Sequence, residues 1–571
     1  MNKFLLLITC YILFAASGIK AFAEEPQTSQ KKSIVKAIKK HSKGNTKQDI
    51  NYYYQLKKQY PHKYNFTDEQ ALNNLGYLYL SQGKITDALD IFRLNTKEFP
   101  HSANAFDSLA EALLKNKDKK AALQNYQISL KINTENSHAA YEIDKLKYPT
   151  IDKSKFTKIY SKQQYLEDID ELAYRLTTVN PNVYKFISKQ KFWQLIKEKK
   201  KLIQVTISPI NYAQFIWEIS EIFASVSSGH TGLGYFNQQN EILPIKLRFP
   251  VETRLIDNKL YIIDGLINKN KVTSGSEITE INGKNVSKIM ADIFKHLKSP
   301  GFIVSSKIDM FNGYNTALIA YSLGFPQTFE IKTKDNDNVI VLSPLKHYQS
   351  RPLIPAYQQC QKNLCLSTHK KIKTAIITIH SFNYYGSKFK TYKNFIDDSF
   401  KKIQNSDTVN LIIDLRLNNG GSSDTAILLL RYLAKKKFNY FARSQFNEKK
   451  GPFYPVKNRF TGKAYVLIDG NGASTTGHFV SLFKYLKLGT LIGEELGSNE
   501  FSTAGQNFFR SKNTEIFYTI GRYTYITATD SKNYTRGIMP DYFLTQSIED
   551  YLNKIDTVLD YTLKLIKSNQ H

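Results

Sequence analysis

The sequence predicts a multidomain protein of the α and α/β class, and three features of the chain support this prediction. A helical pattern that repeats every 34 residues occupies an early segment, and short β-like runs follow it. Strands then alternate with helices from residue 372 onward. A chain of 571 residues has room for two or three domains of ordinary size.

The N-terminus has the features of an export signal. A basic start precedes an apolar run up to Ile19, and an A-x-A sequence that ends at Ala23 supplies a cleavage site. We therefore expect residues 1–23 to be a signal peptide cleaved after Ala23, and the mature protein to be periplasmic or secreted. A retained anchor is the alternative, although the run is shorter than the roughly 20 residues of a spanning helix. We expect no transmembrane segment after the signal.

The chain is strongly basic, with 79 Lys and Arg residues against 50 Asp and Glu residues and a net charge of +29. These charges are spread along the chain, so the sequence favours contact with anionic envelope components or acidic partners. Nucleic acid is not an expected partner, because the sequence contains no recognition motif and export removes access to it.

Two cysteines follow the leader, Cys360 and Cys365. In an exported protein their spacing suits a disulfide that closes a small loop, and two free or buried thiols are the alternative. No second cysteine pair and no histidine pair stands at ligand spacing, so the sequence predicts no metal site.

A repeat appears when residues 50–148 are laid over themselves at a shift of 34 residues. Ala88 then matches Ala122, and Phe92 matches Tyr126. This pattern resembles the tetratricopeptide repeat, in which small residues let two antiparallel helices approach and an aromatic residue fills the next gap. The resemblance implies two repeats after a degenerate leading helix, which act either as a spacer or as a binding site for a peptide or protein partner.

Three further segments flank the repeats and lead to the C-terminal part. Residues 24–48 are polar and rich in Lys, so we expect a linker that buries no core. Residues 160–235 form a predicted helical region, or helical cap, that leads to His230. Residues 241–345 are β-rich, and residues 275–283 resemble the G-x-x-I-x-x-I-N-G core of a PDZ-like module in part. The expected strands of this module are 243–249, 260–263, 277–281 and 329–331.

The last segment, residues 372–565, alternates strands, glycine turns and helices. This succession predicts a βαβαβ core with its loops gathered at the carboxyl ends of the strands, where open α/β sheets place their sites. The expected strands are 372–379, 409–416, 464–469 and 491–493, and the first expected helix is 389–404.

Ser474 follows a glycine turn and opens a predicted helix. A hydroxyl in this position can act as a nucleophile, because the helix amides and the macrodipole stabilise the anion that forms. An ordinary N-cap serine is the alternative. A second glycine turn, Gly420-Gly421, ends the neighbouring strand, and its amides can converge with that of Thr475. The sequence therefore predicts an oxyanion hole made by Gly420, Gly421 and Thr475.

Three ordered motifs carry a family resemblance. Residues 411–421 resemble the D-L-R-x-N-x-G-G signature of the tail-specific, or carboxyl-terminal processing, proteases and of their tricorn-core and interphotoreceptor retinoid-binding-protein relatives. Residues 466–497 resemble the nucleophile segment of this superfamily, and residues 537–541 resemble its closing G-I-x-P-D. The resemblance implies a crotonase-like peptidase core and an acyl-enzyme on Ser474. It also implies peptide or protein substrates and no cofactor.

The residue that acts as general base differs between branches of this superfamily. Processing proteases use a lysine after the serine, whereas the matching segment here, residues 494–500, contains none. The tricorn-like branch takes a histidine from far upstream, and residues 228–232 resemble that segment. We therefore expect His230 to be the base, because an imidazole can accept a proton near neutral pH. His478 is the alternative, four residues after the serine on the same helix face.

The third catalytic residue is not assigned. Tricorn-like enzymes place a glutamate where this chain has residues 533–536, which contain none. Ser228, Thr231 and Asp530 are candidates to orient the imidazole. The missing glutamate leaves room for a non-catalytic ligand- or peptide-binding protein on the same fold. A tetratricopeptide-type adaptor is a second alternative. Asp414 and Arg416 are expected to form a structural ion pair under the glycine turn.

Overall fold

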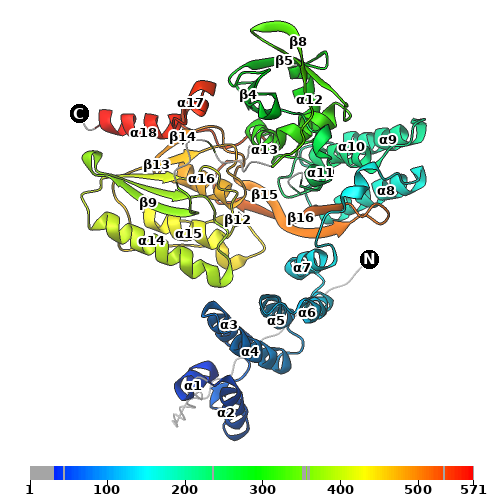
Figure 1. The fold of residues 1–571 in the computed structure, drawn as a ribbon. Coiled ribbons are helices and arrows are strands. Elements are labelled where there is room, and N and C mark those ends of the chain that lie inside the picture. Colours follow the sequence, from blue (N-terminus) through cyan, green and yellow to red (C-terminus); the bar gives the residue numbers. More distant parts are fainter. Residues whose placement is uncertain are drawn as a thin grey trace, which may run out of the picture. The chain divides into compact units, whose positions relative to one another are not determined.

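The computed structural model describes residues 31–42, 45–234, 237–349, 355, 360–531 and 534–569 (Figure 1). The predicted signal peptide, residues 1–23, lies outside this part of the chain. The chain divides into two compact units between Asn116 and Lys117. None of the described helices has both the length and the apolar character needed to cross a membrane.

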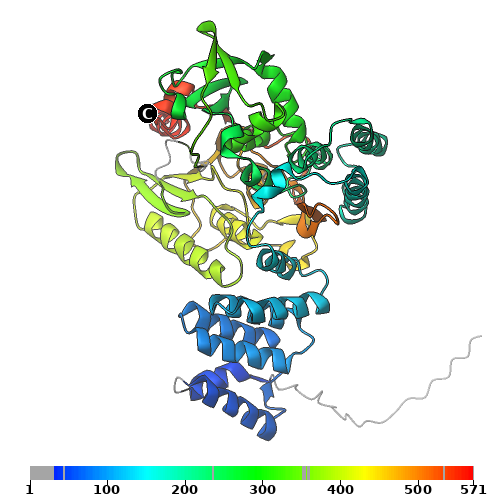
Figure 2. The same cartoon turned by 45° about the vertical axis from the view of Figure 1, so that its right-hand side comes forward.

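The first unit is helical, apart from a two-residue pairing of β1 with β2 (Figure 2). Helices α3 and α4 pack closely, because a Cβ placed on Gly76 of α3 would lie 2.5 Å from the ring of Phe92 on α4. The glycine therefore permits the close approach of the two helices. The elements are β1 (Lys32–Ser33), α1 (Ile34–His41), α2 (Thr46–Gln59), β2 (Tyr64–Asn65), α3 (Glu69–Ser81), α4 (Ile85–Glu98) and α5 (Ala103–Lys115).

The prediction that residues 24–48 bury no core is wrong for the helix α1. Ile34, Val35 and Ile38 are buried in a cluster with Leu72 and Leu75. Their spacing places three apolar side chains on one helix face, although the segment as a whole is rich in lysine. The average composition of the segment concealed this amphipathic pattern.

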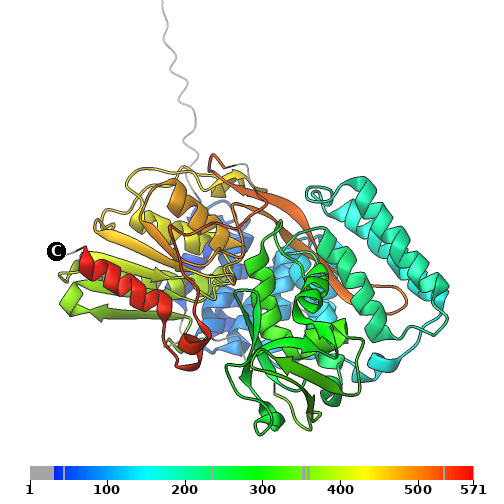
Figure 3. The same ribbon diagram turned by 90° about the horizontal axis from the view of Figure 1, so that it is seen from above.

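The second unit begins with helices that lead to the His230 loop. Helices α8, α9 and α10 pack side by side (Figures 2 and 3). Helix α10 is apolar on most sides and lies in the first hydrophobic core of this unit. The helices are α6 (Lys119–Ile132), α7 (Ser137–Lys147), α8 (Lys162–Val179), α9 (Lys189–Val205), α10 (Tyr212–Ser225) and α11 (Asn237–Ile242).

A β module follows, in which five strands form a sheet of order β3-β4-β5-β7-β8 and β6 pairs with β5. The strand expected at 243–249 is wrong, because Ile245–Leu247 is a short 3-10 helix. Proline stands on both sides of this turn, at Pro244 and Pro250, and lacks the N–H group that a strand ladder needs. The elements are β3 (Glu252–Ile256), β4 (Lys259–Asp264), β5 (Glu277–Ile281), β6 (Lys284–Asn285), α12 (Val286–His296), α13 (Val304–Ser322), β7 (Phe329–Thr333) and β8 (Asn336–Leu342).

The C-terminal core is a six-stranded sheet of order β17-β14-β13-β11-β10-β9, in which only β9 runs antiparallel among these strands. Helices α14, α15 and α16 bury one face, and α18 covers the other (Figure 1). The predicted α and α/β fold class is confirmed. The elements are β9 (Leu364–His369), β10 (Thr374–Ile379), α14 (Phe389–Gln404), β11 (Asn410–Asp414), α15 (Ser423–Leu433), β12 (Phe441–Arg443), β13 (Lys463–Ile468), α16 (Thr475–Tyr485), β14 (Thr490–Gly493), β17 (Tyr542–Phe543), α17 (Ile548–Leu552) and α18 (Thr557–Ser568).

The expected ion pair under the glycine turn is present. Arg416 is 3% exposed and donates from Nη2 to Asp414 at 2.7 Å. It also donates from Nη1 to Asp556, the N-cap of α18, at 2.7 Å. The guanidinium therefore joins the end of β11 to the helix on the far face of the sheet.

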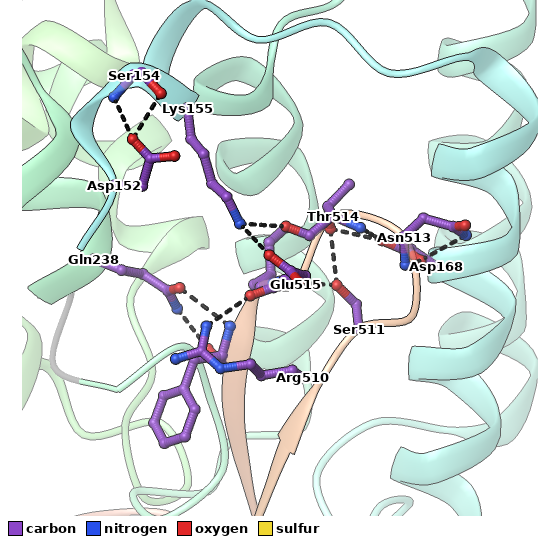
Figure 4. A network of polar contacts seen from close by, with 12 residues as sticks. Asp152, Ser154, Lys155, Asp168, Gln238, Arg510, Ser511, Asn513, Thr514 and Glu515 are labelled. Carbon is purple, nitrogen blue, oxygen red and sulfur yellow. Dashed lines mark hydrogen bonds and ion pairs between the residues drawn. The ribbon is translucent and has the colours of Figure 1, made fainter. Parts of the chain in front are cut away.

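A long hairpin, β15 (Phe501–Arg510) and β16 (Phe517–Thr527), extends from the core to helix α8 (Figure 3). At its tip, the carboxylate of Asp168 on α8 accepts hydrogen bonds from the amides of Asn513 and Thr514, each at 2.9 Å (Figure 4). Lys155 donates to the carboxylate of Glu515 at 2.9 Å. The hairpin therefore connects the sheet core with the helical region.

Candidate active site

Ser474 stands in the turn between β13 and α16, with φ of 54° and ψ of −119°. A non-glycine residue in this region carries strain of about 1–3 kcal/mol and persists only where the surroundings enforce it. Its side chain makes no capping hydrogen bond. Ser474 is therefore not an ordinary N-cap serine, because its half-buried hydroxyl does not cap the helix.

The neighbouring glycine turn packs directly against this serine. Gly420 has φ of +89°, and a Cβ there would lie 2.5 Å from the carbonyl oxygen of Ala473 and 2.8 Å from Cβ of Ser474. The same Cβ would lie 2.9 Å from the amide nitrogen of Thr475. Only glycine fits this position, because any side chain would displace the nucleophile turn.

Asn418 holds the two turns together from a fully buried position. Its Oδ1 accepts from the amide of Gly420 at 2.9 Å and from the hydroxyl of Thr476 at 3.0 Å. Its Nδ2 donates to the carbonyl of Ile379, at the end of β10, at 2.9 Å. Its own carbonyl accepts from the amide of Ala473 at 3.1 Å. One side chain therefore fixes three loops at the carboxyl edge of the sheet.

These hydrogen bonds correct part of the predicted oxyanion hole. The amide of Gly420 is committed to Asn418 and is not directed at a substrate. The amides of Gly421 and Thr475 donate no hydrogen bond to any described residue. Two donors therefore remain next to the serine instead of three.

His230 shares three cavities with Ser474, two large ones of about 570 Å³ and about 720 Å³ and a third of about 20 Å³. Burial, reinforced by the positive charge of Lys298, lowers the pKa of His230 to about 4. Its ring makes no hydrogen bond with a described residue. The imidazole is therefore neutral near pH 7 and available as a proton acceptor.

His478 also reaches this region, where it lines the 720 Å³ cavity beside Ser474. It is 4% exposed, and its Nε2 lies 3.1 Å from the hydroxyl oxygen of Ser502. Its Nδ1 has no partner among the described residues. Burial and the proximity of His230 lower the pKa of His478 to about 3. The structure thus brings both candidate imidazoles to the serine.

The candidates for a third catalytic residue are separated by their contacts. The hydroxyl oxygen of Thr231 accepts from the amide of Gly521 at 3.1 Å, so it fixes the loop. Asp530 accepts a hydrogen bond from Tyr485 at the far end of α16. The hydroxyl of Ser228 is buried and has no partner among the described residues. Asn533 lies outside the described part of the chain.

The sequence analysis did not identify Lys298, which lies between α12 and α13 of the β module. It lines the 570 Å³ cavity with Ser474 and His230, and burial lowers its pKa to about 8. Its side chain packs on Gly232, where a Cβ would lie 2.9 Å from the lysine Cδ. No motif contains this residue, so only its position in the fold associates it with the site.

A disulfide joins Cys360 to Cys365, with a Cα–Cα distance of 6.2 Å. The loop that it closes contributes Gln361, Lys362 and Asn363 to the wall of the 570 Å³ cavity. Within the described residues, no group of three or more His, Cys, Asp or Glu side chains is placed to hold a metal ion.

Comparison with known proteins identifies the class. Residues 373–544 match the family model described as Peptidase family S41, so this part of the chain is a serine-type peptidase domain. Within that class, the segment 373–544 belongs to peptidase family S41, which confirms the resemblance to the processing proteases.

Solved structures that this chain is similar to include mature CPAF, with 12% identity and a TM-score of 0.48 over 71% of this chain and 97% of that chain. A putative peptidase from Parabacteroides merdae shows 14% identity and a TM-score of 0.38, over 71% and 97%. The photosystem II D1 C-terminal processing protease shows 13% identity and a TM-score of 0.34, over 69% and 97%. No curated protein matches the sequence.

The Gly420→Ala variant tests the contact between the two turns. We expect its peptidase activity to fall by about 10²-fold or more, because the added Cβ displaces Ser474 and the amide of Thr475. Gly324→Ala is the matched control, since Gly324 also has a positive φ, +71°, but nothing lies within 4 Å of its added Cβ. Steady-state kinetics on both variants measures the difference. Comparable losses in the two variants would assign the effect to backbone strain alone.

The buried His478 makes the free energy of unfolding depend on pH. Its folded-state pKa is depressed to about 3, so only the unfolded chain takes up a proton near pH 6.5. The stabilisation is full above pH 6.5 and is lost as pH falls toward 3, by about 1.4 kcal/mol per pH unit for this group. Chemical denaturation at pH 7, 6 and 5 should show a shallower loss for His478→Gln than for the wild type. The exposed His101→Gln control should retain the wild-type slope.

Proposed function

We propose that this protein is an exported serine peptidase that hydrolyses peptide bonds through an acyl-enzyme on Ser474, with His230 as general base. One observation carries the proposal: the strained, uncapped Ser474 lies beside the uncommitted amides of Gly421 and Thr475 and shares its cavities with the neutral imidazole of His230. These are the parts that acyl transfer requires.

In the proposed reaction, the hydroxyl oxygen of Ser474 attacks the carbonyl carbon of the scissile peptide bond while His230 accepts the hydroxyl proton. The oxyanion that forms accepts hydrogen bonds from the amides of Gly421 and Thr475. His230 then passes the proton to the leaving amine as the C–N bond breaks. A water molecule, deprotonated by the same imidazole, hydrolyses the ester, and its proton returns to Ser474.

Two considerations favour His230 over His478 as the base. His478 has its Nε2 committed to Ser502, whereas the ring of His230 has no such contact with a described residue. His478 also belongs to the first turn of the helix that the serine opens and is 4% exposed, which limits its approach to the hydroxyl. His230 approaches from a separate loop and borders both large cavities.

The proposed location is outside the cytoplasm, in the periplasm or beyond the cell. The leader-like residues 1–23 support it, as does the Cys360–Cys365 disulfide, because such bonds persist in oxidising compartments. The proposed substrates are peptides or proteins that enter the cavities beside Ser474. We also propose that the tetratricopeptide-like helices serve as a spacer or bind a protein partner.

A fluorophosphonate probe tests the nucleophile and the base together. We expect the wild type to be labelled, Ser474→Ala to be unlabelled, and His230→Ala to react at least about 10³-fold more slowly, because the hydroxyl loses its proton acceptor. His478→Ala should react within about tenfold of the wild-type rate. In-gel fluorescence and mass spectrometry of the labelled peptide measure these rates.

The same experiment separates the alternatives. A large loss in His478→Ala with little change in His230→Ala would transfer the role of base to His478. A folded wild type that remains unlabelled would identify a non-catalytic binding protein on the same fold.

The pH dependence of the acylation rate tests the state of His230. The neutral imidazole is the active form, so the acylation rate should be half-maximal near pH 4 and should rise to a plateau above it. We call this rise of the rate with pH the acid limb. Lys298 is protonated in this range and disfavours the imidazolium, so Lys298→Met should move this limb to higher pH.

Pulse labelling between pH 3.5 and 8, at each pH where circular dichroism shows folded protein, measures the limb. Lys201→Met, which removes an exposed lysine of α9, is the control and should leave the limb in place. An unmoved limb in Lys298→Met would show that burial alone sets the pKa of His230.

A further inference from the structure

Helix α7 is bound to strand β15 of the long hairpin. The carboxylate of Asp144 accepts from Nε of Arg510 at 2.6 Å and from Nη2 at 2.9 Å. Both side chains are largely shielded from solvent, at 19% and 24% exposure, and a bidentate pair of this kind is stronger than an ordinary surface ion pair. The ring of Tyr141 lies 5.1 Å from that of Phe508. The helix therefore contacts β15 through both a charged pair and an aromatic pair.

The turn that precedes α7 is bound to the other strand, β16. Nη2 of Arg522 donates to the carbonyl of Glu135 at 2.6 Å, and the hydroxyl of Tyr523 donates to the carboxylate of Glu135 at 2.8 Å. Helix α7 thus contacts β15, and Glu135, in the turn that precedes the helix, contacts β16.

The same strand holds the loop that carries His230. Gly232 and Thr519 exchange two backbone hydrogen bonds, each of 2.9 Å. The amide of Gly521 donates to the hydroxyl of Thr231 at 3.1 Å. Gly521 is followed directly in the chain by Arg522, so the contacts to the His230 loop and to the α7 segment are adjacent on β16.

We propose that helix α7 and Glu135 position His230 for catalysis by holding β16 against the His230 loop. Asp144 and Glu135 are then positioning residues, since neither is placed to touch the reacting atoms. This inference rests on the proposed role of His230 as general base, and it gives the helical segment before the peptidase core a role in that site.

The geometry of the hairpin explains why this support matters. A two-stranded ribbon is flexible unless other elements pack on it. Asp168 and Lys155 also hold its tip (Figure 4). Its base pairs with β12. The contacts to α7 and to the His230 loop lie between these two anchors. Loss of the α7 contacts should therefore loosen the middle of the hairpin without unfolding it, and small displacements of a catalytic group are costly.

Helix α7 also borders the site directly. Its first residue, Ser137, lines the 720 Å³ cavity together with Ser474, His230 and Arg522. A displacement of the helix would thus change the wall of the cavity as well as the support of the imidazole.

The test uses charge reversal in the full-length protein. Asp144→Arg and Arg510→Asp each place like charges at the α7–β15 contact, and the double variant restores an opposite pair in the reverse order. Asp170→Arg is the matched control, because it breaks the exposed ion pair with Lys200 on the surface of α8 and α9. Asp144→Asn, which keeps the size of the side chain, replaces Asp144→Arg should that variant fail to fold.

The first measurement is amide hydrogen exchange, which needs no catalysis. We expect peptides that span residues 230–234 and 517–521 to exchange about tenfold faster in each single variant than in the wild type. The double variant should come within about threefold of the wild type, and Asp170→Arg should match it. Wild-type exchange of these peptides in both single variants would overturn the inference.

The second measurement is the fluorophosphonate acylation rate and its pH profile. The single variants should lose about tenfold in rate, and their acid limb should move to higher pH, because a loosened His230 is more hydrated and its pKa rises. A merely structural role of α7 would lower the melting temperature but leave the limb at the wild-type pH, and that result would also overturn the inference. An unlabelled wild type would instead refute the proposed function, while hydrogen exchange would still decide whether α7 supports the loop.

Discussion

The side-chain amide of Asn418 lies at the point where three loops of the sheet edge meet, and the geometry of the site depends on its hydrogen bonds. It accepts from Gly420 and Thr476 and donates to Ile379, so the end of β10, the glycine turn and the nucleophile turn have one common partner. A buried amide left without partners costs about 1–3 kcal/mol, which is the size of the strain carried by the backbone of Ser474. The hydrogen bonds at the sheet edge, and not the helix α16 that Ser474 opens, therefore hold the strained backbone of Ser474 in place.

Burial decides the protonation states around the serine. His230, His478 and Lys298 all have their pKa values lowered chiefly by the loss of water, so both imidazoles are neutral at pH 7. At the start of the turn that leads to Ser474, burial raises the pKa of Asp469 to about 7, and that carboxyl accepts from the amides of Leu417 and Asn471. The site thus places a neutral imidazole beside a lysine whose positive charge disfavours the imidazolium.

The sequence predicts the parts of this structure that depend on local pattern. The buried strands β10, β11, β13 and β14 are continuous apolar runs, and glycine turns mark Ser474, Gly421 and Thr475. The hydrogen bond from the Gly420 amide to Asn418 was not predictable, because it depends on the orientation of the Asn418 side chain. Lys298 and the contacts of β16 were missed for a different reason. These contacts join segments far apart in the chain, such as Thr231 and Gly521, and the periodic patterns of a sequence do not predict such pairs.

The catalytic pair proposed here is assembled from two hydrophobic cores. Ser474 stands at the edge of the sheet core, whereas the loop of His230 follows α10 of the helical and β-module core. The long hairpin contributes to both cores: Tyr518 and Ile520 lie in the first, and Tyr525 lies in the second. Because protein interiors are close-packed, each core fixes the side chains that the hairpin buries in it. The hairpin thus links the core beside Ser474 to the core that carries the His230 loop, and α7, which packs on β15 of this hairpin, packs on that link.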